Sequence, residues 1–244
     1  MTNKVAAIIT NYNMPERTNA LVEYIHENAK YPVDVIVVDN GSDLVKGSDY
    51  TTVQLDYNVQ TTRGWLAGLD SLKEQYFAYW FLITSAEFTA QSNDPLTPMV
   101  EKLNSDKNAV GVHSALTLDS TTAWKHLITN GGTGCRQTWM LDNISSLYRA
   151  DWFDSIGRFD PELIYAWGID LETSYKAREQ KRGLYVCEDA KIRKITDIGY
   201  SMDRMNMSAS KRGQLAGQNM REVLERKYGS DYWMRMMEEY REGL

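Results

Sequence analysis

Three short polar segments of the sequence carry side chains that could bind a ligand. The segments "TNYN" at residues 10–13 and "DNGSD" at residues 39–43 each follow an apolar run with the composition of a buried strand. A third, "TSAE" at residues 84–87, follows the apolar run 79–83. Neighbouring parallel strands bring their carboxyl ends together over one crevice, where α/β proteins bind ligands. Asp39 is placed to accept hydrogen bonds from a base N–H group or a ribose hydroxyl, although Asp-Asn-Gly-Ser is also an ordinary turn sequence.

A pair of carboxylates in "YAWGIDLE", residues 165–172, could do acid–base chemistry. Asp170 and Glu172 lie two residues apart at the start of a predicted helix, directly after Trp167 and Gly168. A carboxylate so placed can take a proton from an attacking hydroxyl. The alternative is structural, because acidic side chains in the first turn of a helix stabilise it through the helix dipole. At this point both interpretations stay open.

Alternating strands and helices in the first half must position these segments. Apolar runs rich in β-branched residues predict strands at 5–10, 33–39, 51–55, 79–83 and 109–116. Between them, Pro15 opens a first helix, and Trp65 and Leu69 lie on the apolar stripe of a second. Asp94 is the expected cap of a third helix, with Pro95 at its first position. Such alternation predicts an α/β fold with a mostly parallel, doubly wound sheet flanked by helices.

The second half is less regular. Residues 116–145 are rich in Thr, Asn and Gly and are expected to be mainly loop. A strand and short helix follow, then a helix that ends near Gly183, and then a final strand. From Ser201 to the end the chain is predicted to be helical, with a break at Gly229. The pattern predicts one compact unit, residues 1–200, with a C-terminal helical extension, residues 201–244.

The composition argues against several classes of protein. The 244 residues carry a formal net charge of −6, whereas a general nucleic-acid-binding protein normally shows a basic stripe. No stretch approaches the roughly 18 consecutive apolar residues of a membrane span. The N-terminus lacks the pattern of a signal peptide, which favours a cytoplasmic setting. Cys135 and Cys187 show neither metal spacing nor a disulfide framework.

Five segments, in the right order, resemble motifs of the family 2 glycosyltransferases, which have the GT-A fold. The opening of that family is similar to "VAAIITNYNMPE" and "VIVVDNGSD", and its glycine-containing helix start to "RGWLAGLD". The helix and strand after its metal motif are similar to "DPLTPMVEKLNSDKNAVGV". Its acceptor-side block is similar to "SSLYRADWFDSIGRFDPELIYAWGIDLETSYKAREQKRGLYV". The resemblance implies a GT-A domain with a nucleotide-sugar half, residues 1–115, and an acceptor half, residues 116–200.

The resemblance also implies a reaction and a set of site residues. A sugar would pass from a nucleotide diphosphate donor to the hydroxyl of a glycan or another acceptor, with inversion. Asp170 would take the acceptor proton, Glu172 would orient the acceptor or support the helix start, and Trp167 and Gly168 would lie beside the acceptor. The expected donor-binding residues are Thr10, Asn11, Tyr12, Asp39, Asn40, Arg63, Gly64, Ser85, Glu87 and Lys194. A helix start next to a guanidinium, as at Arg63 and Gly64, favours a diphosphate.

The metal motif of that family is degraded in this chain. The family's Asp-x-Asp binds Mg²⁺ or Mn²⁺ across the two donor phosphates, and the equivalent residues here are Ser85-Ala86-Glu87, or Thr84-Ser85-Ala86 in a shifted register. Lys194 stands about where the family often has a histidine ligand. Either Glu87 holds Mn²⁺ or Mg²⁺ with waters and the diphosphate, or protein cations stabilise the leaving diphosphate. The candidate cations are Lys194, Arg193, Arg204 and Arg212.

The alternative function is a non-catalytic descendant of the same fold that binds nucleotide or glycan without transferring sugar. The weakened metal motif favours this alternative, whereas the intact Trp-Gly-x-Asp-x-Glu segment favours an enzyme. A nucleotidyltransferase would need a glycine-rich phosphate loop after the first strand, and "TNYNMPE" is not one. The sequence does not name the sugar, the nucleotide, the acceptor or the oligomeric state.

Overall fold

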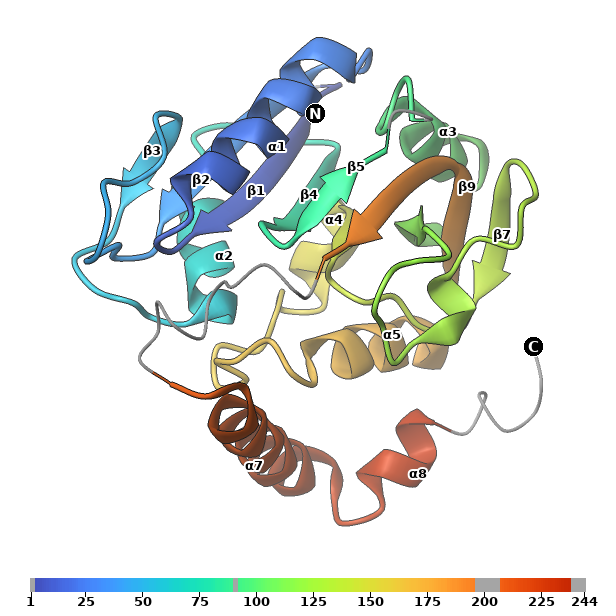
Figure 1. The fold of residues 1–244 in the computed structure, drawn as a ribbon. Coiled ribbons are helices and arrows are strands. Elements are labelled where there is room, and N and C mark those ends of the chain that lie inside the picture. Colours follow the sequence, from blue (N-terminus) through green and yellow to red (C-terminus); the bar gives the residue numbers. More distant parts are fainter. Residues whose placement is uncertain (1–2, 90–91, 196–206, 238–244) are drawn as a thin grey trace.

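The computed structural model describes residues 3–89, 92–195 and 207–237, and helices flank a mixed sheet in it (Figure 1). In these residues nine strands form the sheet in the order β3-β2-β1-β4-β8-β6-β9-β5, with β7 pairing β9. The strands are β1 Val5–Asn11, β2 Val33–Asp39, β3 Thr51–Gln54, β4 Ala78–Ile83, β5 Ala86–Phe88, β6 Ala109–Leu116, β7 Cys135–Thr138, β8 Ser145–Arg149 and β9 Gly183–Lys194. The helices are α1 Pro15–Asn28, α2 Thr61–Asp70, α3 Thr97–Ser105, the 3₁₀ helix η1 Lys125–Leu127, α4 Ala150–Ser155, α5 Ile169–Glu179, α7 Ala209–Tyr228 and α8 Tyr232–Met236.

Strands β1 to β4 run parallel, as the apolar runs predict. β1 lies between β2 and β4 and pairs with both in parallel, with Asn11 opposite Asp39 and Thr10 opposite Ile83. β3 extends the sheet in parallel on the far side of β2. The polar segments that follow β1, β2 and β4 therefore meet at one edge of the sheet, at the carboxyl ends of the strands.

The strands after β4 include antiparallel ones, so the sheet is mixed. β8 pairs antiparallel with both β4 and β6, whereas β6 and β9 run parallel. β5 and β7, of 3 and 4 residues, pair antiparallel with β9. These two strands are too short to show an apolar run, and for this reason the sequence predicts no separate strand at either place. The predicted α/β class, with helices flanking the sheet, is confirmed.

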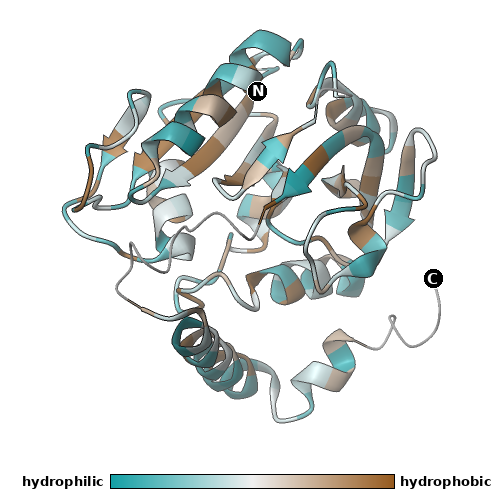
Figure 2. Ribbon diagram, viewed as in Figure 1, coloured by the Kyte–Doolittle hydropathy of each residue, from teal (hydrophilic) through white to brown (hydrophobic). Residues whose placement is uncertain are grey.

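The sheet has a helical layer on each face, and alternate residues of β1 point to the two layers. Val5, Ala7 and Ile9 pack with the apolar stripes of α1 and α3. Ala6 and Ile8 pack in a second cluster with residues of α2, α4 and α5. Figure 2 shows hydrophobic residues concentrated along the central strands, as expected for strands that are covered on both faces.

Helix α3 begins two residues later than the sequence predicts. Pro95 is the expected first helical residue, but α3 begins at Thr97 and carries Pro98 in its first turn. The N-cap of α3 is Leu96 and not Asp94, but Oδ1 of Asp94 accepts hydrogen bonds from the N–H groups of Leu96 at 3.2 Å and Thr97 at 3.1 Å. Both prolines lie where a missing N–H costs no helical hydrogen bond.

The C-terminal helices pack on the side of the sheet that carries α5 (Figure 1). α7 buries Val223 and Leu224 in the second core cluster, and α8 adds Tyr232 and Met236. Gly229 ends α7 with a φ of 87°, so the predicted break at this glycine is confirmed. The predicted boundary at residue 200 and the candidate cation Arg204 lie in 196–206, outside the described residues.

Two further sequence-based expectations concern membranes and cysteines. Within the described ranges, no helix combines the length and the apolar character needed to span a bilayer. Cys135 and Cys187 are free thiols, and they lie directly opposite each other in the β7–β9 pair. The spacing of the cysteines does not predict this contact, because β7 is placed by its pairing with a strand far along the chain.

Candidate active site

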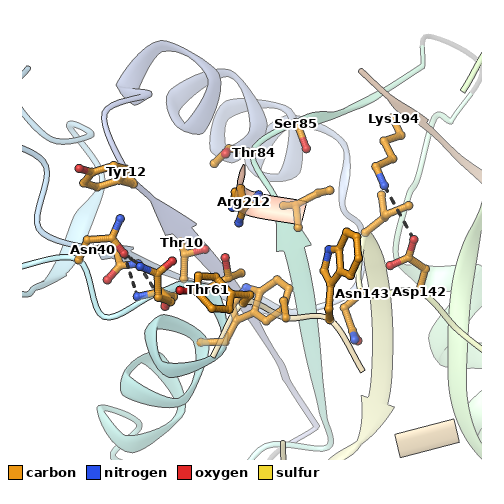
Figure 3. Close-up of a pocket in the computed structure, with 18 residues that line it drawn as sticks. Thr10, Tyr12, Asn40, Thr61, Thr84, Ser85, Asp142, Asn143, Lys194 and Arg212 are labelled. Carbon is orange, nitrogen blue, oxygen red and sulfur yellow. Dashed lines mark hydrogen bonds and ion pairs between the residues drawn. The ribbon is translucent and has the colours of Figure 1, made fainter. Parts of the chain in front are cut away.

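A pocket of about 250 Å³ opens at the carboxyl edge of β1, β2 and β4, where the polar segments meet (Figure 3). Its lining comes from the strand ends, the loops before α2, β8 and α5, helix α2 itself and the first turn of α7. The lining residues are Thr10, Tyr12, Asn40, Asn58, Gln60, Thr61, Trp65, Ile83, Thr84, Ser85, Asp142, Asn143, Ile144, Tyr165, Ala166, Trp167, Lys194 and Arg212. Of the residues predicted from the sequence, the structure brings together here Thr10, Tyr12, Asn40, Thr84, Ser85, Trp167, Lys194 and Arg212.

Tyr12 and Asn40 form one end of the pocket, which we call the β1–β2 end (Figure 3). Nδ2 of Asn40 donates to Oδ1 of Asn58 and to the carbonyl oxygen of Gln60, each at 3.2 Å. The hydroxyl of Tyr12 donates to Oδ1 of Asp43 at 3.2 Å. Asn58 and Gln60 lie in a loop that matches no sequence motif, so the sequence does not predict their place in the site. A held aromatic ring and a held amide therefore line this end.

Asn11 and Asp39 do not belong to the pocket lining. Both are fully buried, and Nδ2 of Asn11 donates to Oδ2 of Asp39 at 3.1 Å. The N–H of Ser42 donates to Oδ1 of Asp39 at 2.7 Å, and Thr18 donates to Oδ1 of Asn11 at 2.9 Å. These hydrogen bonds close the turn after β2 and tie it to β1, so both carboxylate oxygens of Asp39 have partners within the protein.

Arg63 and Gly64, predicted at a helix start, lie on α2 outside the lining. α2 begins at Thr61, and Nε of Arg63 donates to the carbonyl oxygen of Pro161 at 3.0 Å. Gly64 permits close packing, because a Cβ atom there would lie 2.8 Å from Cγ2 of Thr10. The first turn of α2 therefore approaches the end of β1, and Thr61 is the residue of this turn that lines the pocket.

Residues 84–87, at the position of the family's metal motif, do not all face the pocket. Thr84 and Ser85 line the pocket, whereas Glu87 lies on β5 beside β9. The Glu87 carboxylate is 3.3 Å from Nη1 of Arg193 and 3.6 Å from Nη1 of Arg17, and it lines a separate cavity along α1. Glu87 is therefore the partner of two arginines and does not contribute to the pocket.

Lys194 and Asp142 form the other end of the pocket, which we call the β9 end (Figure 3). Nζ of Lys194 is 3.9 Å from Oδ2 of Asp142, the outer limit of an ion pair. Burial raises the pKa of Asp142, and the charge of Lys194 opposes this shift. Asp142 belongs to no motif that predicts a site residue. The one local feature that could have indicated it is the polar pair Asp142-Asn143 just before β8, in a segment that the sequence predicts to be mainly loop.

Asp170, the predicted base, lies in the first turn of α5 and is 9% exposed. Its side chain is not part of the pocket lining, and its Oδ1 accepts a hydrogen bond from the N–H of Gly168 at 3.1 Å. Burial, with a further contribution from the charge of Asp142, raises the pKa of Asp170 to about 7. Asp142, which does line the pocket, is therefore near enough for the two carboxyl groups to interact. A carboxyl group with such a pKa can gain and lose a proton near neutral pH.

Trp167 and Gly168 contact the C-terminal helix α7. Trp167 lines the pocket and is 50% exposed, and Cβ atoms at Gly213 and Gly217 would lie 3.9 Å and 3.8 Å from its ring. These two glycines lie four residues apart on one face of α7, which leaves space for the ring. Gly168 has a φ of +90°, and a Cβ atom there would lie 2.7 Å from Cγ of Met220. This part of the motif is therefore packed against α7.

Gly168→Ala is expected to destabilise the fold by about 1–3 kcal/mol, because alanine would be held in a left-handed conformation and would displace Met220. Gly213→Ala on the facing helix should have the opposite effect. Its Cβ atom would meet Trp167 at 3.9 Å, an ordinary contact, and alanine is favoured over glycine within a helix by roughly 0.5–1 kcal/mol. Thermal unfolding of both variants measures the difference. Destabilisation of the same size in both would contradict this packing.

Glu172 is buried under α7, with 1% of its surface exposed. Its Oε1 accepts hydrogen bonds from the hydroxyl of Tyr228 at 2.7 Å and from Nζ of Lys227, and Nζ of Lys176 is 3.4 Å away. Lys227 also donates to Oδ2 of Asp160 at 2.7 Å. The contacts of Glu172 join α5 to the C-terminal helix, and they place its carboxylate away from the pocket.

The residues of the pocket do not fit a divalent metal centre. Mn²⁺ and Mg²⁺ are bound by several oxygen ligands, carboxylates above all. In the described part of the chain, no three His, Cys, Asp or Glu side chains come together in a group that could hold a metal. Among the described residues, Asp142 is the single acidic side chain in the pocket lining, and it shares the pocket with the cations Lys194 and Arg212. Two positive charges beside one carboxylate disfavour a metal ion.

Comparison with known proteins places the fold. No protein-family model matches the chain, and no curated protein matches it significantly. Among the solved structures that match are GalNAc-T7 with UDP, GalNAc and Mn²⁺, at a TM-score of 0.63 and 13% identity, and the mannosyltransferase PcManGT from Pyrobaculum calidifontis with GDP-Man and Mn²⁺, at a TM-score of 0.61 and 15% identity. The fold is the GT-A glycosyltransferase fold. The GT-A match covers 79% and 88% of this chain but 44% and 64% of the two others, less than two thirds of either.

Proposed function

We propose that the chain is a glycosyltransferase of the family 2 type. It moves a sugar from a nucleotide diphosphate donor to an acceptor hydroxyl with inversion. The observation that carries the proposal is the pocket itself, which lies at the carboxyl ends of β1, β2 and β4 in a GT-A fold. Ligands of open α/β sheets bind at this edge. The β1–β2 end, with Tyr12 and Asn40, suits a nucleoside, and the β9 end suits the sugar and the acceptor.

The proposed reaction needs one base. The oxygen of the acceptor hydroxyl attacks the anomeric carbon of the donor sugar while a carboxylate takes the hydroxyl proton. The bond between the anomeric carbon and the phosphate oxygen breaks, and its electron pair leaves with the nucleoside diphosphate. Attack opposite the leaving group inverts the configuration of the anomeric carbon. Asp170 is the proposed base, because burial raises its pKa to about 7, where it can accept a proton and release it again.

The aromatic and amide groups of the lining would orient the two substrates. The exposed face of Trp167, which lines the pocket, is suited to the apolar face of a sugar ring. Asn40 is held by its own hydrogen bonds, so its position costs little entropy when a nucleoside binds. The position of Glu87 does not support its predicted metal-binding role, because its carboxylate forms ion pairs with two arginines, Arg17 and Arg193.

One observation favours the alternative of binding without transfer. Asp170 does not line the pocket, and its carboxyl group already accepts a hydrogen bond from the N–H of Gly168. Glu172, the other acid of the motif, is held by Lys227 and Tyr228. A chain that binds nucleotides or glycans without transferring sugar would keep the pocket and have no use for an accessible base.

A thermal-shift screen against UDP, GDP, ADP and CDP tests the proposed donor site. A ligand that binds only the folded state at 100 times its Kd stabilises it by about 2.7 kcal/mol. For a chain of this size that raises Tm by about 5–10 °C. At least one of the four nucleotides should give such a shift. If none does, with or without Mn²⁺, the proposed donor site is wrong.

Release of the nucleoside diphosphate separates the enzyme from the binding protein. The nucleotide sugars that carry the stabilising nucleotide are incubated with the protein, and free nucleoside diphosphate is measured over time. Slow hydrolysis by water is expected without an acceptor, because the same base can activate water. Binding of the nucleotide with no turnover of any nucleotide sugar, in the presence of a range of hydroxyl acceptors, would favour the alternative.

A further inference from the structure

Two cationic side chains from distant parts of the chain line the pocket. Lys194 is the last residue of β9, and Arg212 lies in the first turn of α7. In the view of Figure 3, Arg212 lies between the β1–β2 end with Tyr12 and Asn40 and the β9 end with Lys194. A nucleotide sugar bound along the pocket would have its nucleoside at the first end and its sugar at the second. Its diphosphate would then lie beside Arg212.

Arg212 has an unmet hydrogen-bonding group at this place. Its Nε is buried and has no hydrogen-bond partner among the described residues. Buried donors nearly always find an acceptor, and a guanidinium left without one is unfavourable. A phosphate oxygen is the acceptor that a guanidinium fits best, because its N–H groups form a planar fork. The unmatched donor therefore points to an anionic ligand in the pocket.

Lys194 also keeps capacity for a ligand. Its Nζ lies 3.9 Å from the carboxylate of Asp142, too far for a close hydrogen bond. An ammonium group has three N–H donors. Asp142 is the one acidic residue in the lining, so Lys194 and Arg212 leave the described lining with a positive balance. The nearby carboxylate of Glu87 does not change this balance, because Arg17 and Arg193 pair with it outside the pocket.

We propose that Arg212 and Lys194 bind the diphosphate of the donor directly and stabilise the charge that develops on it as it leaves. This assignment rests on the proposed function and names the phosphate-binding groups of the same pocket. Fixed cations aimed at a leaving group stabilise the transition state without rearranging, and here they take the electrostatic place of a divalent metal. Thr84 and Ser85 line the pocket at the end of β4 and add hydroxyl groups for the phosphate oxygens.

Calorimetric titration of the full chain with UDP, GDP, ADP and CDP in the presence of EDTA tests the assignment. The nucleoside diphosphate that binds most tightly should bind without metal. Addition of Mn²⁺ should change its Kd by less than about twofold, a difference too small to reflect a metal-bridged diphosphate. The matching nucleoside, without phosphates, serves as the probe of the β1–β2 end alone.

Arg212→Ala and Lys194→Ala should each weaken binding of that nucleoside diphosphate about 10- to 100-fold, the usual loss for a hydrogen bond to a charged group. Binding of the nucleoside should stay unchanged, which shows that the pocket is still folded. Arg212→Lys should fall between the alanine variant and the wild type, because the charge stays and the planar fork is lost.

Matched controls come from the neighbouring residues. Arg193→Ala on β9 and Lys211→Ala on α7 each remove one positive charge next to a tested residue without touching the pocket lining. Both should bind the nucleoside diphosphate as the wild type does. Glu87→Gln should also leave the Kd unchanged, because its carboxylate is paired outside the pocket. Equal weakening in the tested variants and in these controls would show a general charge effect and overturn the assignment.

Two other outcomes separate this assignment from the proposed function. Binding that needs Mn²⁺, or that is unaffected by Arg212→Ala and Lys194→Ala, overturns the assignment and leaves a nucleotide-binding glycosyltransferase in place. Failure of all four nucleotides to bind, with EDTA and with Mn²⁺, contradicts the proposed function and the assignment together.

Discussion

Asp170→Asn is expected to lower the rate of sugar transfer about 100- to 10,000-fold, the usual contribution of a general base. The amide cannot take the proton from the acceptor hydroxyl, but its oxygen can still accept the hydrogen bond that Gly168 donates to Oδ1 of Asp170. Binding of the nucleoside diphosphate should therefore stay at the wild-type level. The rate of nucleoside diphosphate release, measured with the donor found by the thermal-shift screen, gives the comparison.

The pH dependence of the wild-type rate provides a second readout. The base acts in its ionised form, and burial raises the pKa of Asp170 to about 7. The rate should therefore rise as pH increases through about 7 and then level off. Glu179→Gln, an exposed position on the same helix, is the matched control and should keep both the rate and the profile. If the wild-type rate does not change across neutral pH, or if Asp170→Asn keeps full activity, another residue is the base.

The same substitution should stabilise the fold at alkaline pH. The pKa of Asp170 rises from 3.8 to about 7 on folding, and each unit corresponds to about 1.36 kcal/mol, so the ionised group costs the folded state up to about 4 kcal/mol. Between these two pKa values the folded state holds a proton that the unfolded state has released. Wild-type stability therefore falls as pH rises through this window, and that of Asp170→Asn does not. Urea unfolding on both sides of neutrality should show a gap between the two proteins that widens with pH.

Lys227→Met is expected to lower the free energy of unfolding by about 3 kcal/mol, because breaking a buried ion pair leaves a charge without compensation. Lys227 donates hydrogen bonds to both Glu172 and Asp160, two carboxylates with 1% and 8% of their side chains exposed. The effect should lie at the low end of the range, since Lys176 stays 3.4 Å from Glu172. For a chain of this size, Tm should fall by about 6–12 °C.

Arg226→Met, one residue earlier on α7, is the matched control. Arg226 pairs with Glu162 at the surface, with 59% and 54% of the side chains exposed, and such pairs contribute about 1 kcal/mol or less.

Burial alone would raise the pKa of Asp160, but the hydrogen bond from Lys227 brings it below the ordinary value. The contribution of Lys227 is therefore present above the ordinary carboxyl pKa and is lost as pH falls through the lowered pKa of Asp160. Equal losses of stability in the two variants would contradict this network.

The C-terminal helix connects these predictions with the phosphate site. Lys227 and Arg212 lie 15 residues apart on α7, which is about 22 Å at a rise of 1.5 Å per residue. Lys227 anchors one end of the helix to α5, and Trp167 packs against Gly213 and Gly217 near the other end. These contacts hold α7 in the position that brings Arg212 to the pocket. The helix is therefore part of the proposed site and more than an appendage to the sheet.

Local sequence patterns are sufficient to predict the frame of the site. The runs "VAAIIT", "VDVIVVD" and "AYWFLI" are long enough, and rich enough in apolar and β-branched residues, to indicate buried parallel strands. Their polar successors must then meet at one edge, because the strands run in the same direction. The sequence also places Trp167, Gly168 and Asp170 at a helix start, and the structure has α5 begin at Ile169.

Only the tertiary structure decided which side chains enter the pocket. Asp39 and Asn40 are adjacent, yet hydrogen bonds hold the Asp39 carboxylate in a buried position outside the lining while Asn40 lines the pocket. Glu87 turns to Arg17 and Arg193 because β5 pairs with β9, a strand about a hundred residues away in the chain. Asp142 and Arg212 reach the pocket by the packing of a loop and of a C-terminal helix. A local pattern specifies an element and its buried face, whereas the direction of a polar side chain at the end of a strand depends on contacts with distant residues.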